Sequence, residues 1–231
     1  MSKYKNIFID LDDTIWNTRA NARESMEEIF FEYQFDKHFT SFDFFYNIYN
    51  INNLKLWDLY HFGKITKQQL MRDRFLFPIQ QGGIDDEKIA VKYGHDFLER
   101  TTTKTKLVPH AIELLDYLFP KYRLFILSNG FRELQHRKVA NSGLAHYFEK
   151  IILSEDAGVN KPHPDIYHYA LKTTNSRKSE SIMIGDNPET DIAGAHKIKM
   201  DQIYFADNQS INIEFEPNYT VNSLLEIMKI L

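Results

Sequence analysis

The amino-acid sequence predicts an α/β fold, a doubly wound, Rossmann-like parallel sheet with a helical cap subdomain inserted after the first strand. Short apolar runs without polar alternation recur along the chain, as expected of strands buried on both faces of a parallel sheet. Helical patterns separate these runs, which is the alternation of βαβ units. Between the first two runs, residues 16–100, about 85 residues, have no strand pattern, and this stretch is too long for a loop.

The apolar runs mark the strands, and capping or turn residues mark the helices. The predicted strands are Ile7–Leu11, Leu124–Leu127, Ile151–Leu153, Ile182–Ile184 and Ile203–Phe205. The predicted helices are Ala111–Leu118 after Pro109, Phe131–Asn141 before Gly143, one from Pro164, one from Asn187-Pro188 through Ala195, and Ile227–Leu231 behind a capping box at Ser223 and Glu226.

The long insertion is predicted to be all helical. Apolar residues at 26, 29, 30 and 33 follow the spacing of one helix face, and Thr66-x-x-Gln69 is a capping box. We therefore expect two parts: a core made of residues 1–15 and 101–231, and a cap made of residues 16–100.

Composition excludes several classes of function. The 231 residues carry a formal charge of −4, which gives no reason to expect a nucleic-acid polymer or an anionic membrane as partner. The absence of cysteine excludes disulfides, thiolate metal sites and thiol catalysis. The first apolar run is broken by Asp10, so it does not resemble a signal peptide, and no run approaches the roughly 20 apolar residues of a membrane span. These features predict a cytoplasmic protein, of undetermined oligomeric state, that acts on a small molecule.

The strongest local signal is Asp10-Leu11-Asp12-Asp13-Thr14, directly after the first apolar run. Because neighbouring carboxylates repel one another, such a group is costly unless a cation or hydrogen-bond donors compensate it. Alternate residues at a strand end share a direction, so Asp10 and Asp12 are expected to converge and offer Mg²⁺ an oxygen-rich site. The alternative is a solvated acidic turn that caps a helix.

A second acidic segment, from Gly185 to Asp191, follows the fourth run. Gly185 allows close approach of the backbone, and Asp186 would add a carboxylate to the first pair. Asp191 would lie one turn later, behind the residues that contact the metal. The alternative is ordinary turn and helix-cap chemistry at Asn187.

Two further segments follow the remaining strands. The hydroxyl and amides of Ser128-Asn129-Gly130 would bind an oxyanion, unless this is an ordinary βα turn. Lys161 lies between turn-forming residues and is less free than a surface lysine, and the alternative is an ordinary solvated lysine. The Arg132–Lys138 stretch is expected to be a solvated helix face, and His163 is interpreted as part of a helix start.

The combination of the four segments decides between these alternatives. In a doubly wound sheet the carboxyl ends of the strands share one edge, where ligands bind. Carboxylates for a metal, with a lysine and a hydroxyl for phosphate oxygens, indicate phosphoryl transfer.

These segments resemble the four motifs of the haloacid dehalogenase superfamily, with Asp10 to Thr14 as the first, Ser128 as the second, Lys161 as the third, and Gly185-Asp186 with Asp191 as the fourth. The resemblance covers essentially the whole chain and includes a cap after the first motif. Within the superfamily the sequence is similar to the small-cap 5′-nucleotidases, which dephosphorylate nucleoside monophosphates. The stretches that carry this likeness are Leu56-Trp57, Tyr60, Gly63 to Thr66, Arg74-Phe75 and Ser128 to Phe131.

The resemblance implies a mechanism that agrees with the residues. Asp10 would attack phosphorus and form an aspartyl-phosphate, and Asp12 would protonate the leaving group and then activate water. Mg²⁺ would be held by Asp10, the backbone carbonyl of Asp12, and Asp186, with Asp191 and Thr14 behind them. The predicted substrate contacts are Thr14, Ser128, Asn129, Gly130, Phe131, Lys161 and, in the cap, Trp57.

Four alternatives remain open. A sugar-phosphate phosphatase or a phosphomutase would use the same motifs. A haloacid dehalogenase proper would lack the second aspartate, so Asp12 argues against it. A receiver-like phosphoacceptor switch would be far shorter and would have no cap.

Overall fold

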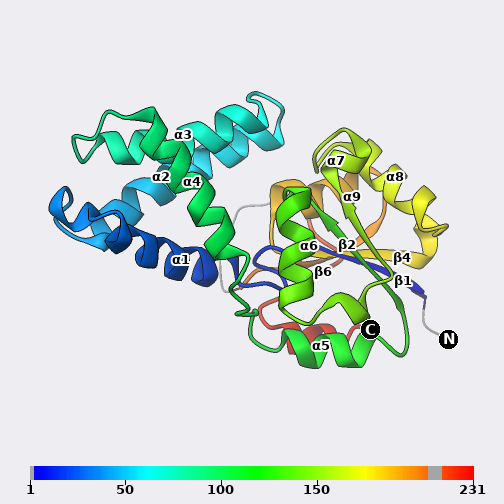
Figure 1. Ribbon diagram of the computed structural model, residues 1–231. Coiled ribbons are helices and arrows are strands. Elements are labelled where there is room, and N and C mark those ends of the chain that lie inside the picture. The colour runs from blue at the N-terminus through cyan, green and yellow to red at the C-terminus, as the bar shows by residue number, and fades with distance from the viewer. Residues whose placement is uncertain (1–2, 208–214) are drawn as a thin grey trace. The chain divides into compact units, whose positions relative to one another are not determined.

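The computed structural model describes residues 3–207 and 215–231. The chain forms two compact units, which we call the sheet unit, Met1–Thr18 with Thr105–Leu231, and the helical unit, Arg19–Lys104. The divisions fall at 18/19 and 104/105, a few residues after the expected 15/16 and 100/101. Figure 1 shows the course of the chain through both units.

The sheet unit contains a parallel six-stranded sheet in the order β3-β2-β1-β4-β5-β6. The strands are β1 (Asn6–Ile9), β2 (Arg123–Ser128), β3 (Lys150–Leu153), β4 (Ser181–Gly185), β5 (Asp201–Phe205) and β6 (Tyr219–Val221). The predicted fold class is confirmed, and the five predicted strands are present. The sequence did not indicate β6, because it is only three residues long and two of them are exposed.

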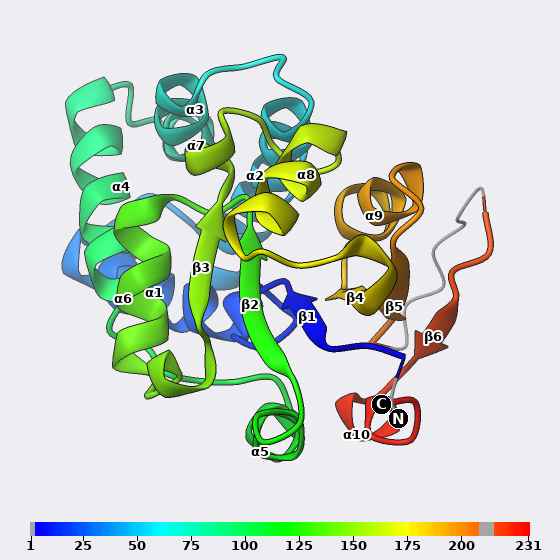
Figure 2. The ribbon, with the colours of Figure 1, turned by 90° about the vertical axis from the view of Figure 1, so that its right-hand side faces the viewer.

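The two faces of the sheet bury different side chains of the same strands. In β1, Ile7 and Ile9 belong to one hydrophobic cluster and Phe8 belongs to another. Because successive residues of a strand point to opposite faces, both faces must be covered. Side chains of α5 (Ala111–Leu118), α6 (Arg132–Asn141) and α10 (Leu224–Ile227) cover the first face. Those of α8 (Pro164–Thr173) and α9 (Ala193–Lys197) cover the second, around the strands seen in Figure 2.

Most of the helices predicted for this unit are present in the structure. The helices are α5 (Ala111–Leu118), α6 (Arg132–Asn141), α7 (Ser154–Ala157), α8 (Pro164–Thr173), α9 (Ala193–Lys197) and α10 (Leu224–Ile227). His163 caps α8, and Asn187 caps a turn of π-helix, Pro188–Ile192, that leads into α9. The expected C-terminal helix to Leu231 is wrong: α10 ends at Ile227, and Ser223 accepts only from the Leu225 N–H, 3.3 Å away.

The helical unit consists mainly of long helices that pack around an aromatic core. Its helices are α1 (Thr18–Glu32), which begins at the unit boundary, α2 (Phe42–His61), α3 (Lys67–Gln80) and α4 (Glu87–Thr101). The predicted capping box is confirmed, since the Thr66 hydroxyl accepts from the Gln69 N–H and Gln69 accepts from the Thr66 N–H. Phe45 and Tyr93 are fully buried among the rings of this core. No helix in the described part of the chain is long and apolar enough to cross a bilayer.

Candidate active site

The central strands bring three predicted residues to one edge of the sheet. β1 lies between β2 and β4, so Asp10, Ser128 and Asp186 follow or end three neighbouring strands. The Asp10 N–H donates to the carbonyl of Ile184 at 2.9 Å, which fixes the start of the acidic loop beside β4. Asp10 is 6% exposed. This is the point where the strand order reverses, which is where doubly wound sheets bind ligands.

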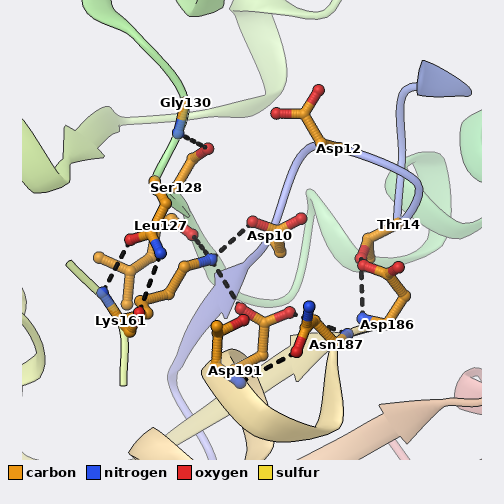
Figure 3. Close-up of polar contacts among 12 residues, drawn as sticks. Asp10, Asp12, Thr14, Leu127, Ser128, Gly130, Lys161, Asp186, Asn187 and Asp191 are labelled. Carbon is orange, nitrogen blue, oxygen red and sulfur yellow. Dashed lines mark hydrogen bonds and ion pairs between the residues drawn. The ribbon is translucent and has the colours of Figure 1, made fainter. Parts of the chain in front are cut away.

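Lys161 lies at the centre of this group (Figure 3). Its ammonium is 2.6 Å from Asp10 Oδ1, 2.6 Å from Asp191 Oδ1 and 2.8 Å from the carbonyl of Leu127. The Asn129 amide holds the lysine in place by donating to the Lys161 carbonyl and accepting from the Lys161 N–H. The ammonium donates hydrogen bonds to Asp10 and to the Leu127 carbonyl, and its contact with Asp191 is an ion pair.

Three carboxylates form a group that could hold a metal ion. Asp10, Asp186 and Asp191 each offer an oxygen, and these oxygens lie within 4.8 Å of one another. A single ammonium leaves the group with an excess of negative charge. Buried carboxylate oxygens with uncompensated charge are the donor set that a hard cation such as Mg²⁺ prefers, so these residues fit the ion.

The pKa values of these groups reflect the excess charge. Burial raises the pKa of Asp10 to about 8, against the opposing effect of Lys161. Burial, followed by the charges of Asp10 and Asp191, raises the pKa of Asp186 well above its ordinary value. Burial opposes the charge of Lys161, but the two neighbouring aspartates outweigh it and raise the pKa of the ammonium.

Asp191 is part of this group rather than behind it. The hydroxyl of Tyr167, in α8, donates to the backbone carbonyls of Thr190 and Asp191, at 2.8 and 3.0 Å. A Cβ on Gly185 would lie 2.3 Å from Asp191 Oδ2, so the glycine leaves the space that this carboxylate occupies. Nothing in the helical pattern around Tyr167 had indicated its contact with the site.

The structure corrects the expected phosphate contacts of Thr14. Its hydroxyl is fully buried, donates to Asp186 Oδ1 at 3.0 Å and accepts from the Asp186 N–H at 3.1 Å. Thr14 therefore positions Asp186, and its hydroxyl proton is not free for a substrate.

The Ser128 loop differs in detail from the predicted oxyanion cradle. Ser128 Oγ accepts from the Gly130 N–H at 3.0 Å and from Gln135 Nε2 at 2.8 Å. The Gly130 amide is thus occupied, contrary to expectation, and one side-chain N–H of Asn129 donates to the Lys161 carbonyl. Because a hydroxyl has two acceptor sites and one donor, the Ser128 proton can still be donated.

Asp12 does not converge with Asp10, contrary to expectation. β1 ends at Ile9, so the strand alternation no longer applies at residue 12. Thr18 Oγ1 and Lys138 Nζ are 2.7 and 2.6 Å from Asp12 Oδ1, and Gln135 Nε2 is 2.5 Å from Oδ2. Burial raises the pKa of Asp12, but the charge of Lys138 and these hydrogen bonds outweigh it and lower the pKa.

The Arg132–Lys138 stretch is not simply a solvated face. Gln135 is fully buried and Lys138 is 7% exposed, and both point into the site. Gln135 and Lys138 are three residues apart, and Gln135 follows the Ser128-Asn129-Gly130 loop by five residues. This spacing places both side chains on one face of the helix and was the signal in the sequence that they lie near the loop. It was missed because the helix has no apolar stripe to reveal which face is buried.

The two predicted aromatic contacts differ in exposure. Phe131 is 1% exposed, and its contact with a substrate stays a prediction. Trp57 lies in α2 and is half-buried, with its ring centre 5.6 Å from Tyr60 and 5.4 Å from His61.

The family model for haloacid dehalogenase-like hydrolases matches residues 7–205, which include every acidic and cationic residue of this site. The chain belongs to this hydrolase family. The protein is therefore an enzyme, a hydrolase.

Two relatives and one solved structure are similar over nearly the whole length of this hydrolase. The pyrimidine 5′-nucleotidase YjjG of Escherichia coli is 29% identical over 99% of this chain and 98% of its own. The glyceraldehyde 3-phosphate phosphatase of Pyrococcus furiosus is 27% identical over 100% of this chain and 94% of its own. The crystal structure of the HAD-hydrolase YfnB of Bacillus subtilis bound to magnesium has a TM-score of 0.88 at 24% identity, over 99% of both chains. The likeness to the YfnB structure, at this identity, shows the fold alone.

Proposed function

We propose that this protein is a Mg²⁺-dependent phosphomonoester hydrolase that acts through an aspartyl-phosphate on Asp10, and that its substrate is a nucleoside 5′-monophosphate. The observation that carries the proposal is the buried group of Asp10, Asp186 and Asp191 around Lys161. Asp10 Oδ1 is bound to Lys161, and Oδ2 has no hydrogen bond from the described residues, so Oδ2 is the oxygen available for attack.

Asp10 and Asp186, with the backbone carbonyl of Asp12, would hold the ion, and Asp191 lies in the same group. When bound, Mg²⁺ supplies positive charge that reduces the repulsion between the Asp10 carboxylate and the phosphate. Lys161, whose ammonium is 2.6 Å from Asp10 Oδ1, supplies positive charge to the same carboxylate. The magnesium in the YfnB structure and the donor set of this site support this part of the proposal.

The chemistry divides into two displacements. Asp10 forms a bond to phosphorus while the bond to the alcohol oxygen breaks, and Asp12 gives that oxygen its proton. Asp12 then takes a proton from water, whose oxygen attacks phosphorus and releases Asp10 and inorganic phosphate. The Ser128 hydroxyl donates to a phosphate oxygen throughout.

The substrate class rests on the helical unit and on the relatives. Nucleobases stack on aromatic rings, and each such contact contributes about 1–3 kcal/mol. Trp57 is half-buried rather than sealed in the aromatic core, and the similar YjjG is named a pyrimidine 5′-nucleotidase. The glyceraldehyde 3-phosphate phosphatase favours the second candidate, a sugar-phosphate phosphatase.

The test is phosphate release with Mg²⁺ from a panel of nucleoside monophosphates and sugar phosphates. Wild type should prefer nucleotides, lose activity in excess EDTA, and lose all turnover in Asp10→Asn while keeping its fold. Trp57→Ala should lower kcat/KM for nucleotides more than for sugar phosphates, whereas Phe44→Ala, an exposed aromatic control in the same helix, should change neither. Activity in EDTA or in Asp10→Asn would refute the mechanism, and a tenfold preference for sugar phosphates would refute the substrate class.

A further inference from the structure

Helix α6 buries two polar side chains to which the proposed mechanism assigns no part. The helix reads RELQHRKVAN and is polar around most of its circumference, yet Gln135 and Lys138 are 0% and 7% exposed. Burying a lysine and a glutamine is costly unless both are well partnered. The Lys138 ammonium and the Gln135 amide nitrogen contact Asp12, and the same nitrogen contacts Ser128. Gln135 Oε1 has no hydrogen-bond partner among the described residues.

Both side chains contact Asp12, each at a different oxygen. Lys138 Nζ is 2.6 Å from Oδ1, and its charge also lies 4.5 Å from the centre of the Trp16 ring. Gln135 Nε2 is 2.5 Å from Oδ2. Because the two oxygens are held separately, the contacts fix the rotation of the carboxylate as well as its position.

Gln135 also connects Asp12 to the Ser128 loop. Its Nε2 lies 2.8 Å from Ser128 Oγ, which in turn accepts from the Gly130 N–H. A Cβ on Gly130 would lie 1.7 Å from Gln135 Nε2, so the amide fills the space that the glycine leaves open. The loop, the helix and the acidic motif therefore form one continuous hydrogen-bond network.

The two aspartates of the first motif have separate lysines. Lys161 contacts Asp10, and Lys138 contacts Asp12. Although the aspartates are only two residues apart, neither shares its cation with the other. Asp12 can therefore keep one orientation whether or not the charge around Asp10 changes.

We propose that Gln135 and Lys138 are positioning residues that hold the Asp12 carboxylate at a fixed distance from the Ser128 hydroxyl through both displacements. This inference rests on the proposed function, in which Asp12 transfers protons and Ser128 binds phosphate. Neither side chain touches the reacting atoms, so its effect is exerted through Asp12. A displacement of about 1 Å in such a group costs on the order of 100-fold in rate.

The test compares kcat, KM and the Ki of inorganic phosphate for Lys138→Met, Lys138→Arg and Gln135→Met. Lys138→Met should lower kcat about 100-fold, with KM and Ki changed less than threefold, because Lys138 contacts Asp12 and phosphate binding does not use Asp12. Gln135→Met should lower kcat about 10-fold. Lys138→Arg keeps the positive charge, so its kcat should be at least tenfold higher than that of Lys138→Met. Lys150→Met, the same substitution at an exposed lysine of the sheet unit, should match wild type.

Rapid-quench trapping of the phosphoenzyme adds a second readout. In both Lys138→Met and Gln135→Met, formation and hydrolysis of the phosphoenzyme should slow together, since Asp12 serves both steps. A fall in phosphate affinity equal to the fall in kcat, or no recovery in Lys138→Arg, would mean that α6 only supports the fold and would overturn the inference. If Lys138→Met does not fold, Lys138→Arg and Gln135→Met decide the question by the same criteria. Wild type without turnover on any phosphomonoester would instead overturn the proposed function and this inference with it.

Discussion

Replacing Lys161 with methionine is the most informative perturbation of the buried charge group. The substitution keeps the length of an unbranched side chain but removes an ammonium that contacts two carboxylates and one carbonyl. The lysine is 2% exposed, so water cannot take its place. Asp10, Asp186 and Asp191 would then share a buried site without the cation that now contacts two of them.

Two estimates give the same magnitude for the loss in the free energy of unfolding. Removing one partner of a buried ion pair typically costs about 3–5 kcal/mol. If the protein instead keeps one more carboxyl protonated at pH 7, against an ordinary pKa of 3.8, the cost is about 4 kcal/mol at about 1.36 kcal/mol per pH unit. For a chain of this length, such a loss lowers Tm by roughly 8–16 °C.

The pH dependence of the loss distinguishes this reasoning from simple loss of packing. A carboxyl with a folded-state pKa above its unfolded value holds a proton that the unfolded chain releases, so the folded state loses stability as pH rises from about 4. The Tm gap between wild type and Lys161→Met should therefore widen from pH 5 to pH 8 in EDTA. The measurement is thermal unfolding by circular dichroism, with Lys150→Met as the exposed control. A gap that is below about 3 °C at pH 7, or that does not change with pH, would refute the charge argument.

Three further outcomes follow from particular contacts. Burial raises the pKa of Asp10 to about 8, so metal-free stability falls as pH rises from about 4 towards 8, and Mg²⁺ should raise Tm more at pH 8 than at pH 6 in a thermal-shift titration. Gly185→Ala places a methyl group 2.3 Å from Asp191 Oδ2 and should weaken Mg²⁺ binding, measured by calorimetry, about 10–100-fold; unchanged affinity would contradict the close approach. Arg74 is 4% exposed, and its Nε and Nη2 have no hydrogen-bond partner in the described ranges. Arg74→Met should therefore increase the free energy of unfolding in urea by about 1–4 kcal/mol, and a loss of stability would show that the charge is compensated after all.

The sequence by itself determined the fold class and most of the site's members, because these depend on local patterns. Apolar runs without alternation marked β1 to β5, since strands covered on both faces cannot carry a polar face. Parallel strands end at a common edge, so Asp10, Ser128 and Asp186 could be assigned to one place from their positions after those runs. Thr66 and Asn187 could be recognised as helix caps from the sequence, because a capping side chain accepts from a backbone N–H at most three residues later.

Only the tertiary structure decided how the polar side chains pair. Asp12 turns towards α6 because β1 ends at Ile9, and the direction of a side chain in a loop is not set by strand alternation. The Thr14 hydroxyl and the Gly130 amide are occupied by partners 172 and two residues away along the chain, so their protons are not available as the motif alone suggested. The partner of a buried donor is chosen by distance in space, and a polar helix such as α6 carries no apolar stripe to show which of its faces is inside.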